Sequence, residues 1–173
     1  MSDRRSFLVG SSVLMTHAAF GGVMEAFAAT PRKASFFTDA EMRTLQAVVD
    51  VVLPATDSPA ASAADTHYFV DLALPACASD QAQRTFRDGL SALAREGFER
   101  QAVDAQVALL KARAERDVAL PYDQSFFRIL KDYALAGYFL SEVGATQALA
   151  YEGVPGGYQG DLPLAPNQKA WAL

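Results

Sequence analysis

The fold class follows most directly from residues 123–143, DQSFFRILKDYALAGYFLSEV, the longest and most apolar helical segment of the sequence. Apolar residues recur along it at intervals of three or four, the spacing of one face of an α-helix. They are Phe126, Phe127, Leu130, Tyr133, Ala134, Gly137 and Tyr138. We therefore predict a helix with one broad apolar face. We interpret its aromatic residues as part of the core rather than as the lining of a cofactor pocket.

Gly137 interrupts this helix at a position where most residues would favour helix formation better. A glycine within a helix costs about 1 kcal/mol relative to alanine. The sequence therefore predicts that another backbone approaches the helix closely at Gly137.

Four further helices are expected on the N-terminal side of this segment. The first opens with the capping-box sequence Thr38-Asp39-Ala40-Glu41, in which the threonine and glutamate side chains each bond the other's backbone amide. An apolar stripe follows, made by Met42, Leu45, Val48, Val49 and Val52. Pro54 ends this helix at Leu53 because proline disfavours the helical conformation of the residue before it.

The other three helices are bounded by capping residues, prolines and glycines. We expect Asp65 to cap a helix that stops near Pro75, and Asp80 to cap another that ends at Gly97. Phe86, Leu90, Leu93 and Ala94 lie at core spacing in the latter, with Phe98 after it as a packing anchor. A fourth spans about residues 104–116, with Val107, Leu110 and Ala114 inward and mixed charges at 111–117 facing solvent.

No segment shows the strict alternation or the hairpin-turn dipeptides of β-structure. The prediction is a mostly α protein: a compact bundle of about five helices. An extended, Gly/Pro-rich C-terminal tail follows the bundle, and a cleavable signal peptide precedes it.

Composition limits the functions open to the chain. It has 173 residues, of which 51% are hydrophobic, and a net charge of −5. The apolar content is too high for a disordered chain, and the acidic balance argues against binding to nucleic acid. With Cys77 as the single cysteine and His17 and His67 as the two histidines, cysteine-rich zinc sites and haem attachment within this chain are excluded.

The first 28 residues have the order of an export signal. An arginine pair precedes a weakly apolar run at 9–23, which is too short and too interrupted for a comfortable transmembrane helix. Ala26 and Ala28 are small residues at the positions that a signal peptidase requires. The pair Arg4-Arg5 followed by Phe7-Leu8 resembles a twin-arginine signal. A Sec-type signal and an ordinary N-terminal helix are the alternatives, and the mature domain is expected at 29–173.

The tail, residues 144–173, is rich in glycine and proline and poor in charge, yet it contains Tyr151, Tyr158 and Trp171. A disordered linker would have fewer aromatic residues. Either the tail covers the helices of its own chain, or part of it lies against another protein, where tyrosine and tryptophan are efficient anchors.

Candidate catalytic groups are few. His67 has Asp65 two residues before it and Asp71 four residues after it, and the Asp71 spacing places both groups on one helix face. We interpret this as a local ion pair or capping arrangement rather than as a catalytic site or a haem ligand. Cys77 is interpreted first as a buried thiol, then as half of an interchain disulfide, and last as a nucleophile.

Two parts of the sequence resemble the gluconate 2-dehydrogenase subunit 3 family. One is the first helix, with Phe36-Phe37-Thr38 before it and Leu53-Pro54-Ala55 after it. The other and more specific part is GYFLSEVG at 137–144, followed by Tyr151, Val154-Pro155-Gly156, Tyr158 and Gly160. The resemblance covers nearly the whole chain after residue 28.

The resemblance implies a subunit without a redox group, and therefore no catalytic, cofactor or metal site in this chain. The family binds an FAD-containing dehydrogenase of the glucose–methanol–choline type, and a multihaem cytochrome c commonly completes the complex. It also implies delivery of the folded flavoprotein by the twin-arginine translocase to the periplasmic face of the inner membrane. The candidate partner contacts are Tyr138, Tyr151, Pro155, Gly156, Tyr158 and Trp171. The alternatives are a stand-alone exported enzyme using His67 or Cys77 and a binding domain without an oxidoreductase partner.

Overall fold

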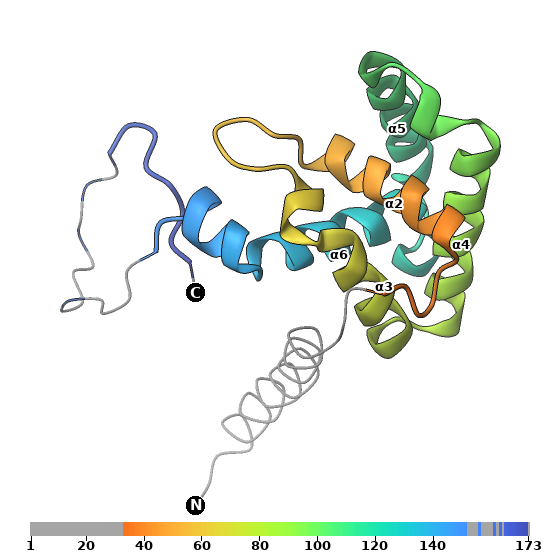
Figure 1. Ribbon diagram of the computed structural model, residues 1–173, viewed down its shortest axis with the longest axis horizontal. Helices are drawn as coiled ribbons and strands as arrows, with labels where there is room; N and C mark the ends of the chain where they lie inside the picture. Colours follow the sequence, from red (N-terminus) through yellow and green to blue (C-terminus); the bar gives the residue numbers. More distant parts are fainter. Residues whose placement is uncertain (1–32, 152–155, 157–160, 162, 164, 173) are drawn as a thin grey trace, which may run out of the picture.

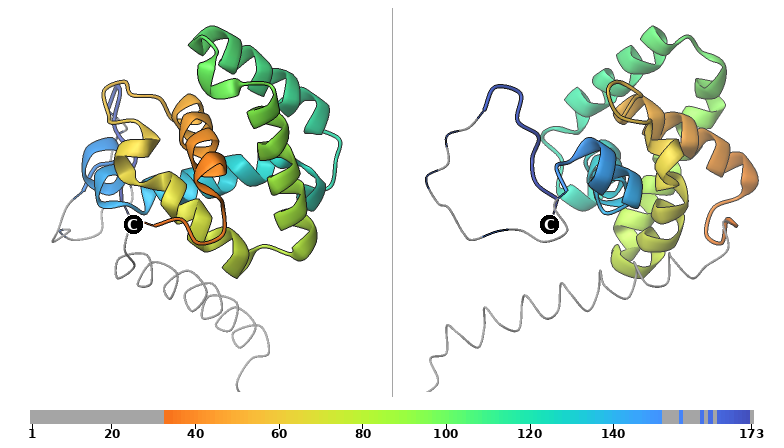
Figure 2. Two further views of the ribbon diagram at one scale, coloured as in Figure 1. Left: turned by 45° about the vertical axis from the view of Figure 1, so that its right-hand side comes forward. Right: turned by 60° about the vertical axis from the view of Figure 1, so that its left-hand side comes forward.

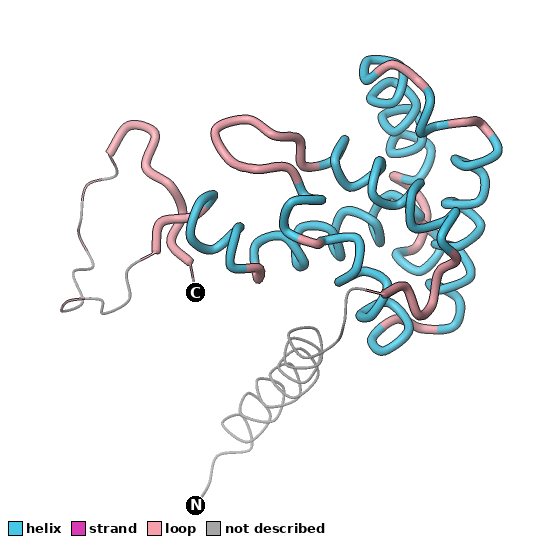
Figure 3. The backbone as a smooth tube through the Cα atoms, in the orientation of Figure 1, coloured by secondary structure: helices cyan, strands magenta, loops and turns pink. Residues whose placement is uncertain are grey.

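The computed structural model describes residues 33–151, 156, 161, 163 and 165–172. These residues contain five α-helices: α2 (Asp39–Val52), α3 (Thr66–Cys77), α4 (Asp80–Arg95), α5 (Val103–Asp117) and α6 (Phe126–Phe139). Short 3-10 turns connect them at Ala61–Ala64, Phe98–Arg100 and Tyr122–Gln124, and a π-helical turn, Gly144–Ala148, follows α6. The described residues contain no strand (Figure 3). The mostly α class and the five helices are thus confirmed.

Helix α6 lies at the centre of the bundle. It contacts each of the other four α-helices. Figures 1 and 2 show it crossing the molecule from the side of α4 and α5 to the side where the C-terminal tail lies. Its inward face is formed by Phe126, Ile129, Leu130, Ala134, Gly137 and Tyr138, all buried. The helix is shorter than the predicted 123–143, because Ser125 caps its start and Leu140 is its C-terminal cap.

The close approach expected at Gly137 exists, but the partner is a side chain and not a backbone. A Cβ atom on Gly137 would lie 2.6 Å from the ring of Phe69 in α3. Gly89 of α4 is packed in the same way, but here the ring belongs to α6: a Cβ atom on Gly89 would lie 2.3 Å from the ring of Phe126. Both glycines allow a phenylalanine ring to fill the space between two helices.

Helix α2 begins as its sequence predicts. Thr38 Oγ1 accepts a hydrogen bond from the amide of Glu41, and Glu41 Oε2 accepts one from the amide of Thr38 at 2.8 Å. The stripe residues of the helix are buried, except for the half-buried Val52. Leu53 is the C-terminal cap, in agreement with the predicted end before Pro54.

Helix α3 differs from the prediction at both ends. Asp65 precedes it with φ 54°, in the left-handed region, and its side chain makes no capping hydrogen bond. The helix also does not stop at Pro75 but continues to Cys77. Proline removes one hydrogen-bond donor, and so close to the end of the helix this loss affects a single intrahelical bond.

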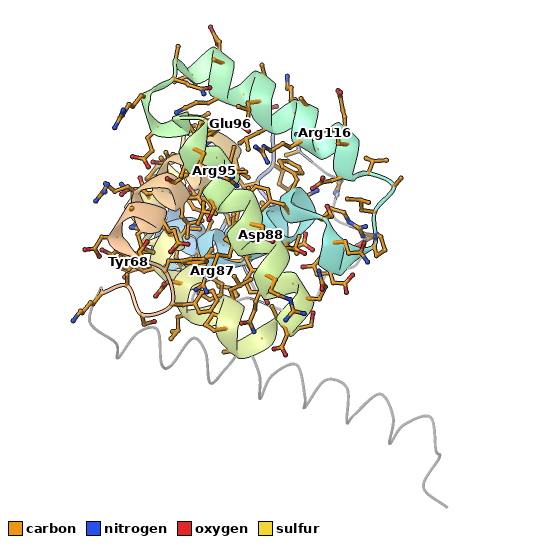
Figure 4. The ribbon with its side chains drawn as sticks, turned by 90° about the vertical axis from the view of Figure 1, so that its right-hand side faces the viewer. Tyr68, Arg87, Asp88, Arg95, Glu96 and Arg116 are labelled. Atoms are coloured by element: carbon orange, nitrogen blue, oxygen red, sulfur yellow. The ribbon has the colours of Figure 1, made fainter. Side chains whose placement is uncertain are left out.

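Helices α4 and α5 also correct details of the prediction. Ser79, not Asp80, caps α4, and Gly97 follows its end with φ 66°, where glycine is favoured. Phe98 is fully buried as expected, whereas Ala94 is exposed. Figure 4 shows Arg87, Asp88, Arg95 and Glu96 following the outer face of α4, which is a mixed-charge surface.

The charges at 111–117 do not all face solvent. Arg113 forms an ion pair with Glu96 of α4 at 2.7 Å, and its side chain is only 14% exposed. Asp117 Oδ2 accepts a hydrogen bond from the amide of Phe127 at 3.0 Å. These charges therefore join α5 to the two neighbouring helices.

A buried carboxylate fixes the segment that precedes α2. Asp71 of α3 is 2% exposed. Its Oδ2 accepts hydrogen bonds from the amide and the hydroxyl of Ser35, at 2.7 and 2.9 Å. Its Oδ1 accepts from the amides of Phe36 and Phe37, at 3.0 and 2.7 Å. Four donors thus satisfy one buried charge, and Phe37 is held in the core.

We predict that Asp71→Asn lowers the free energy of unfolding by about 3 kcal/mol, because hydrogen bonds to charged groups are strong and buried amides become unsatisfied. Chemical denaturation followed by circular dichroism measures this. The matched control is Asp88→Asn on the exposed face of α4, where a change within about 0.5 kcal/mol is expected. Equal effects of the two substitutions would contradict the anchoring role of Asp71.

Candidate partner interface

Exposed apolar side chains occur at the C-terminal end of α6 and in the segments that follow it. Phe139 and Leu140 end the helix with exposed fractions of 36% and 49%, and Tyr151 and Trp171 are 65% and 56% exposed. We call these four residues the tail surface. Large exposed apolar residues that lie together often mark a site where another molecule binds.

Backbone pairing holds the end of the tail beside the segment that follows α6. Ala150 donates its amide to the carbonyl oxygen of Ala170, and Ala172 donates its amide to the carbonyl oxygen of Ala150, both at 2.8 Å. This is an isolated parallel bridge between Ala150 and Trp171. It places Trp171 beside Ala150, the residue before Tyr151, although 21 positions separate the bridged pair in the sequence.

The turn after α6 directs the chain toward this bridge. Ser141 Oγ donates to the carbonyl oxygen of Tyr138 at 2.6 Å and accepts from the amide of Gly144 at 3.0 Å. Gly144 is buried, and a Cβ atom on it would lie 1.9 Å from that same carbonyl oxygen. The turn therefore requires glycine at this position, because a side chain would collide with the backbone of Tyr138.

The structure locates the other candidate contacts as follows. Tyr138 is 2% exposed and donates its hydroxyl to the carbonyl oxygen of Pro59 at 2.7 Å, so it belongs to the core and not to a partner surface. The inward face of α6 is the reason, since positions 134, 137 and 138 turn toward the core together.

Gly156 is exposed. Pro155, Tyr158 and the signal residues Arg4, Arg5, Phe7, Leu8, Ala26 and Ala28 lie outside the described residues.

The described part of the tail is exposed rather than buried over the helices of its own chain, at residues 161, 163 and 165–171. Hydrogen bonds join it to the segment just after α6: besides the bridge at Ala150, Lys169 Nζ donates to the carbonyl oxygen of Gln147. Figure 1 shows this part of the tail, in dark blue, beyond the end of α6.

Cys77 is exposed, which corrects its interpretation as a buried thiol. It lies at the end of α3, beside a pocket of about 510 Å³ that is also lined by Tyr122 and Tyr133. Burial raises the pKa of Tyr133 to about 12 and also raises the pKa of Tyr122, so both phenols stay protonated at neutral pH. The pocket thus brings a thiol near two phenols that are poor bases.

His67 is buried, and its Nδ1 atom has no hydrogen-bond partner. The expected arrangement with Asp71 is not formed, because both carboxylate oxygens of Asp71 bond the residues at 35–37. Burial lowers the pKa of His67 below 6.5, against the raising effect of Asp65 and Asp50. The histidine is therefore neutral at pH 7.

Among the described residues, no group of three or more side chains of His, Cys, Asp or Glu is arranged to hold a metal ion.

The arrangement defines a class of protein: a small helical chain whose most exposed aromatic groups, within the described residues, are Tyr151 and Trp171 beyond the end of α6. The model of the family described as gluconate 2-dehydrogenase subunit 3 matches residues 39–156. The chain belongs to this family. The match begins with α2 and extends past Tyr151 into the tail. No curated protein and no solved structure matches the chain. None of the helices that the structure describes combines the length and apolar character of a membrane-spanning helix.

We predict that Gly144→Ala lowers the free energy of unfolding by about 1–3 kcal/mol, the usual effect of inserting a methyl group where there is no space. Because the turn positions the tail, proteolytic cleavage within the tail should also become faster. Thermal unfolding and limited proteolysis measure the two effects. Gly156→Ala is the matched control, since a Cβ there meets nothing within 4 Å. A Gly144→Ala protein as stable as this control would contradict the assignment.

The lowered pKa of His67 predicts a pH dependence of stability. In the unfolded chain the histidine titrates near 6.5, so below that pH the unfolded state binds a proton that the folded state does not. Stability is therefore full above about pH 6.5 and falls as the pH decreases through this value toward the lowered pKa of the folded state.

His67→Phe keeps an aromatic ring and removes the titration. Between about pH 7.5 and about pH 5.5, the midpoint of thermal unfolding should decrease more in the unmodified protein than in the variant. Parallel pH profiles of the two proteins would show that His67 does not titrate in this range.

Proposed function

We propose that this chain is the non-catalytic small subunit of a periplasmic, FAD-dependent dehydrogenase complex that oxidises a sugar, a polyol or a sugar acid. The proposal rests on membership in the gluconate 2-dehydrogenase subunit 3 family, whose name describes one subunit of a dehydrogenase. The structural observation that carries it is the tail surface. Tyr151 and Trp171 are each more than half exposed, and the backbone bridge pairs Trp171 with Ala150, the residue before Tyr151.

The chemistry of the described residues supports an accessory role. His67 feels the charges of Asp65 and Asp50, but it is buried and burial lowers its pKa. The phenols beside Cys77 stay protonated at neutral pH. Catalysis by a hydroxyl or thiol nucleophile would need a nearby general base that is accessible and has a pKa near 7.

The proposed partner is a flavoprotein of the glucose–methanol–choline type, which contains the FAD and performs the oxidation. A multihaem cytochrome c is the proposed third subunit and accepts the electrons. In this complex the small subunit stabilises the catalytic subunit and carries it, already folded, through the twin-arginine translocase. Cys77 is exposed at the end of α3, where a disulfide with another chain is sterically possible.

We predict that Trp171→Ala and Tyr151→Ala each weaken binding to the catalytic subunit, by about 2 kcal/mol for an anchor residue at an interface. The measurement is the affinity of the purified small subunit for the FAD-containing catalytic subunit. Val118→Ala is the control, because Val118 is 77% exposed and lies near the start of α6, at the other end from the tail surface. Equal affinity of all three variants and the unmodified chain would exclude the tail surface from the interface.

The accessory role has its own test, which is deletion of this chain from cells that express the catalytic subunit. The yield, flavin content and periplasmic delivery of the catalytic subunit should all decrease. Unchanged delivery would contradict the proposal, and so would flavin absorbance or turnover by the purified chain alone.

Replacement of Arg4 and Arg5 by lysine should abolish export of both subunits if the signal is of the twin-arginine type. Fractionation of cells into periplasm and cytoplasm measures this. Undiminished export would indicate the Sec pathway instead.

A further inference from the structure

An apolar groove of about 400 Å³ lies where α2, α5 and α6 meet. Its walls come from all three helices and include Val52, Leu110 and Leu135. The charged residues that line it are Lys111 of α5 and Lys131 of α6, both exposed. Carboxylates are absent from this lining, although the chain as a whole has a net charge of −5. The groove therefore favours an occupant that is apolar in its centre and negative at its edges.

A row of side chains on α6 extends the groove toward the tail surface. Phe127, Lys131, Leu135 and Phe139 follow one another at intervals of four residues. Such a row forms a ridge on a helix surface, and ridges of this kind fit into the grooves of a second helix. The first three residues line the groove, and the fourth belongs to the tail surface. The row therefore leads along α6 from the groove to Phe139.

The length of the row indicates the size of the occupant. From Phe127 to Phe139 the helix rises by about 18 Å, the length of roughly three helical turns. A small apolar ligand would be enclosed over most of its surface, whereas this surface continues along α6 to residues that are exposed. An amphipathic helix laid along a groove makes contacts of this shape through apolar residues at intervals of three and four.

We propose that the groove and the α6 row hold an amphipathic helix of the catalytic subunit, whose apolar face is flanked by carboxylates that meet Lys111 and Lys131. This inference rests on the proposed function, because it assigns a second contact, of defined chemistry, to the same partner. Binding then has two parts. The aromatic groups of the tail surface anchor one end of the interface, and the lysine-edged groove fixes the orientation of a helix along α6.

The test reverses the charges of the groove in the full chain. Lys111→Glu combined with Lys131→Glu should weaken binding to the FAD-containing subunit by about tenfold or more, because like charges then face each other. The loss should diminish at high salt, where charges are screened. The matched control is Arg84→Glu combined with Arg95→Glu, which makes the same change of charge on exposed positions of α4. This control should bind like the unmodified chain. Circular dichroism verifies that both double variants keep their helices.

A carbodiimide cross-link identifies the occupant directly, since it joins a lysine amine to a carboxylate in contact with it. Mass spectrometry should find Lys111 and Lys131 linked to aspartate or glutamate residues on one helix of the catalytic subunit. Links confined to residues of this same chain, or equal binding by the groove and control variants, would overturn the inference while leaving the proposed function intact. Failure of the unmodified chain to bind the catalytic subunit would instead overturn the proposed function.

A fatty acid is the other occupant with an apolar body and a carboxylate. Titration of the purified chain with a fluorescent fatty acid measures this. No saturable binding is expected, and saturable binding that the groove variant abolishes would overturn the inference in favour of a lipid ligand.

Discussion

Helix α6 packs so closely against α3 and α4 that two glycines are needed to admit two phenylalanine rings. Phe69 of α3 lies over Gly137, and Phe126 of α6 lies over Gly89 of α4. Any larger side chain at either glycine would separate the helices, and the core around them is packed without room for such a change. Because α6 contacts each of the other α-helices that the structure describes, this packing fixes its direction through the bundle. The position of the tail surface at its far end follows from that direction, as does the row that lies beside the groove.

Polar interactions then attach the remaining segments to this frame. The carboxylate of Asp71 gathers the amides of residues 35–37, so that the chain reaches α2 with Phe37 already in the core. At the start of α6, the carboxylate of Asp117 accepts a hydrogen bond from the amide of Phe127 and so joins α5 to α6. A buried charge is tolerated only when it is fully hydrogen-bonded, and Asp71 meets that condition with three backbone amides and the hydroxyl of Ser35. The same condition explains why Asp71 is not available to His67.

The aromatic side chains of the protein differ in burial. Phe69, Phe86, Phe126 and Tyr138 are in the core, although family resemblance had placed Tyr138 among the partner contacts. Phe139 at the end of α6 and Tyr151 and Trp171 after it are exposed. On the outer face of α4 the labelled residues are of mixed charge (Figure 4), and Glu96 at its end pairs with Arg113 of α5.

Local patterns in the sequence determined the helix class, the number of helices, the capping box at Thr38 and the end of α2 at Leu53, because these depend on residues within one or two turns of each other. The family was also evident from the sequence, through the motif at 137–144. Tertiary structure alone decided the partners of Asp71, Asp117 and Gly137, the burial of Tyr138 and the exposure of Cys77. It also paired Ala150 with Trp171 and gave Lys111 and Lys131 a common groove. These features join residues that are distant in the chain, and their energies depend on burial and direct contact, which a one-dimensional pattern does not encode.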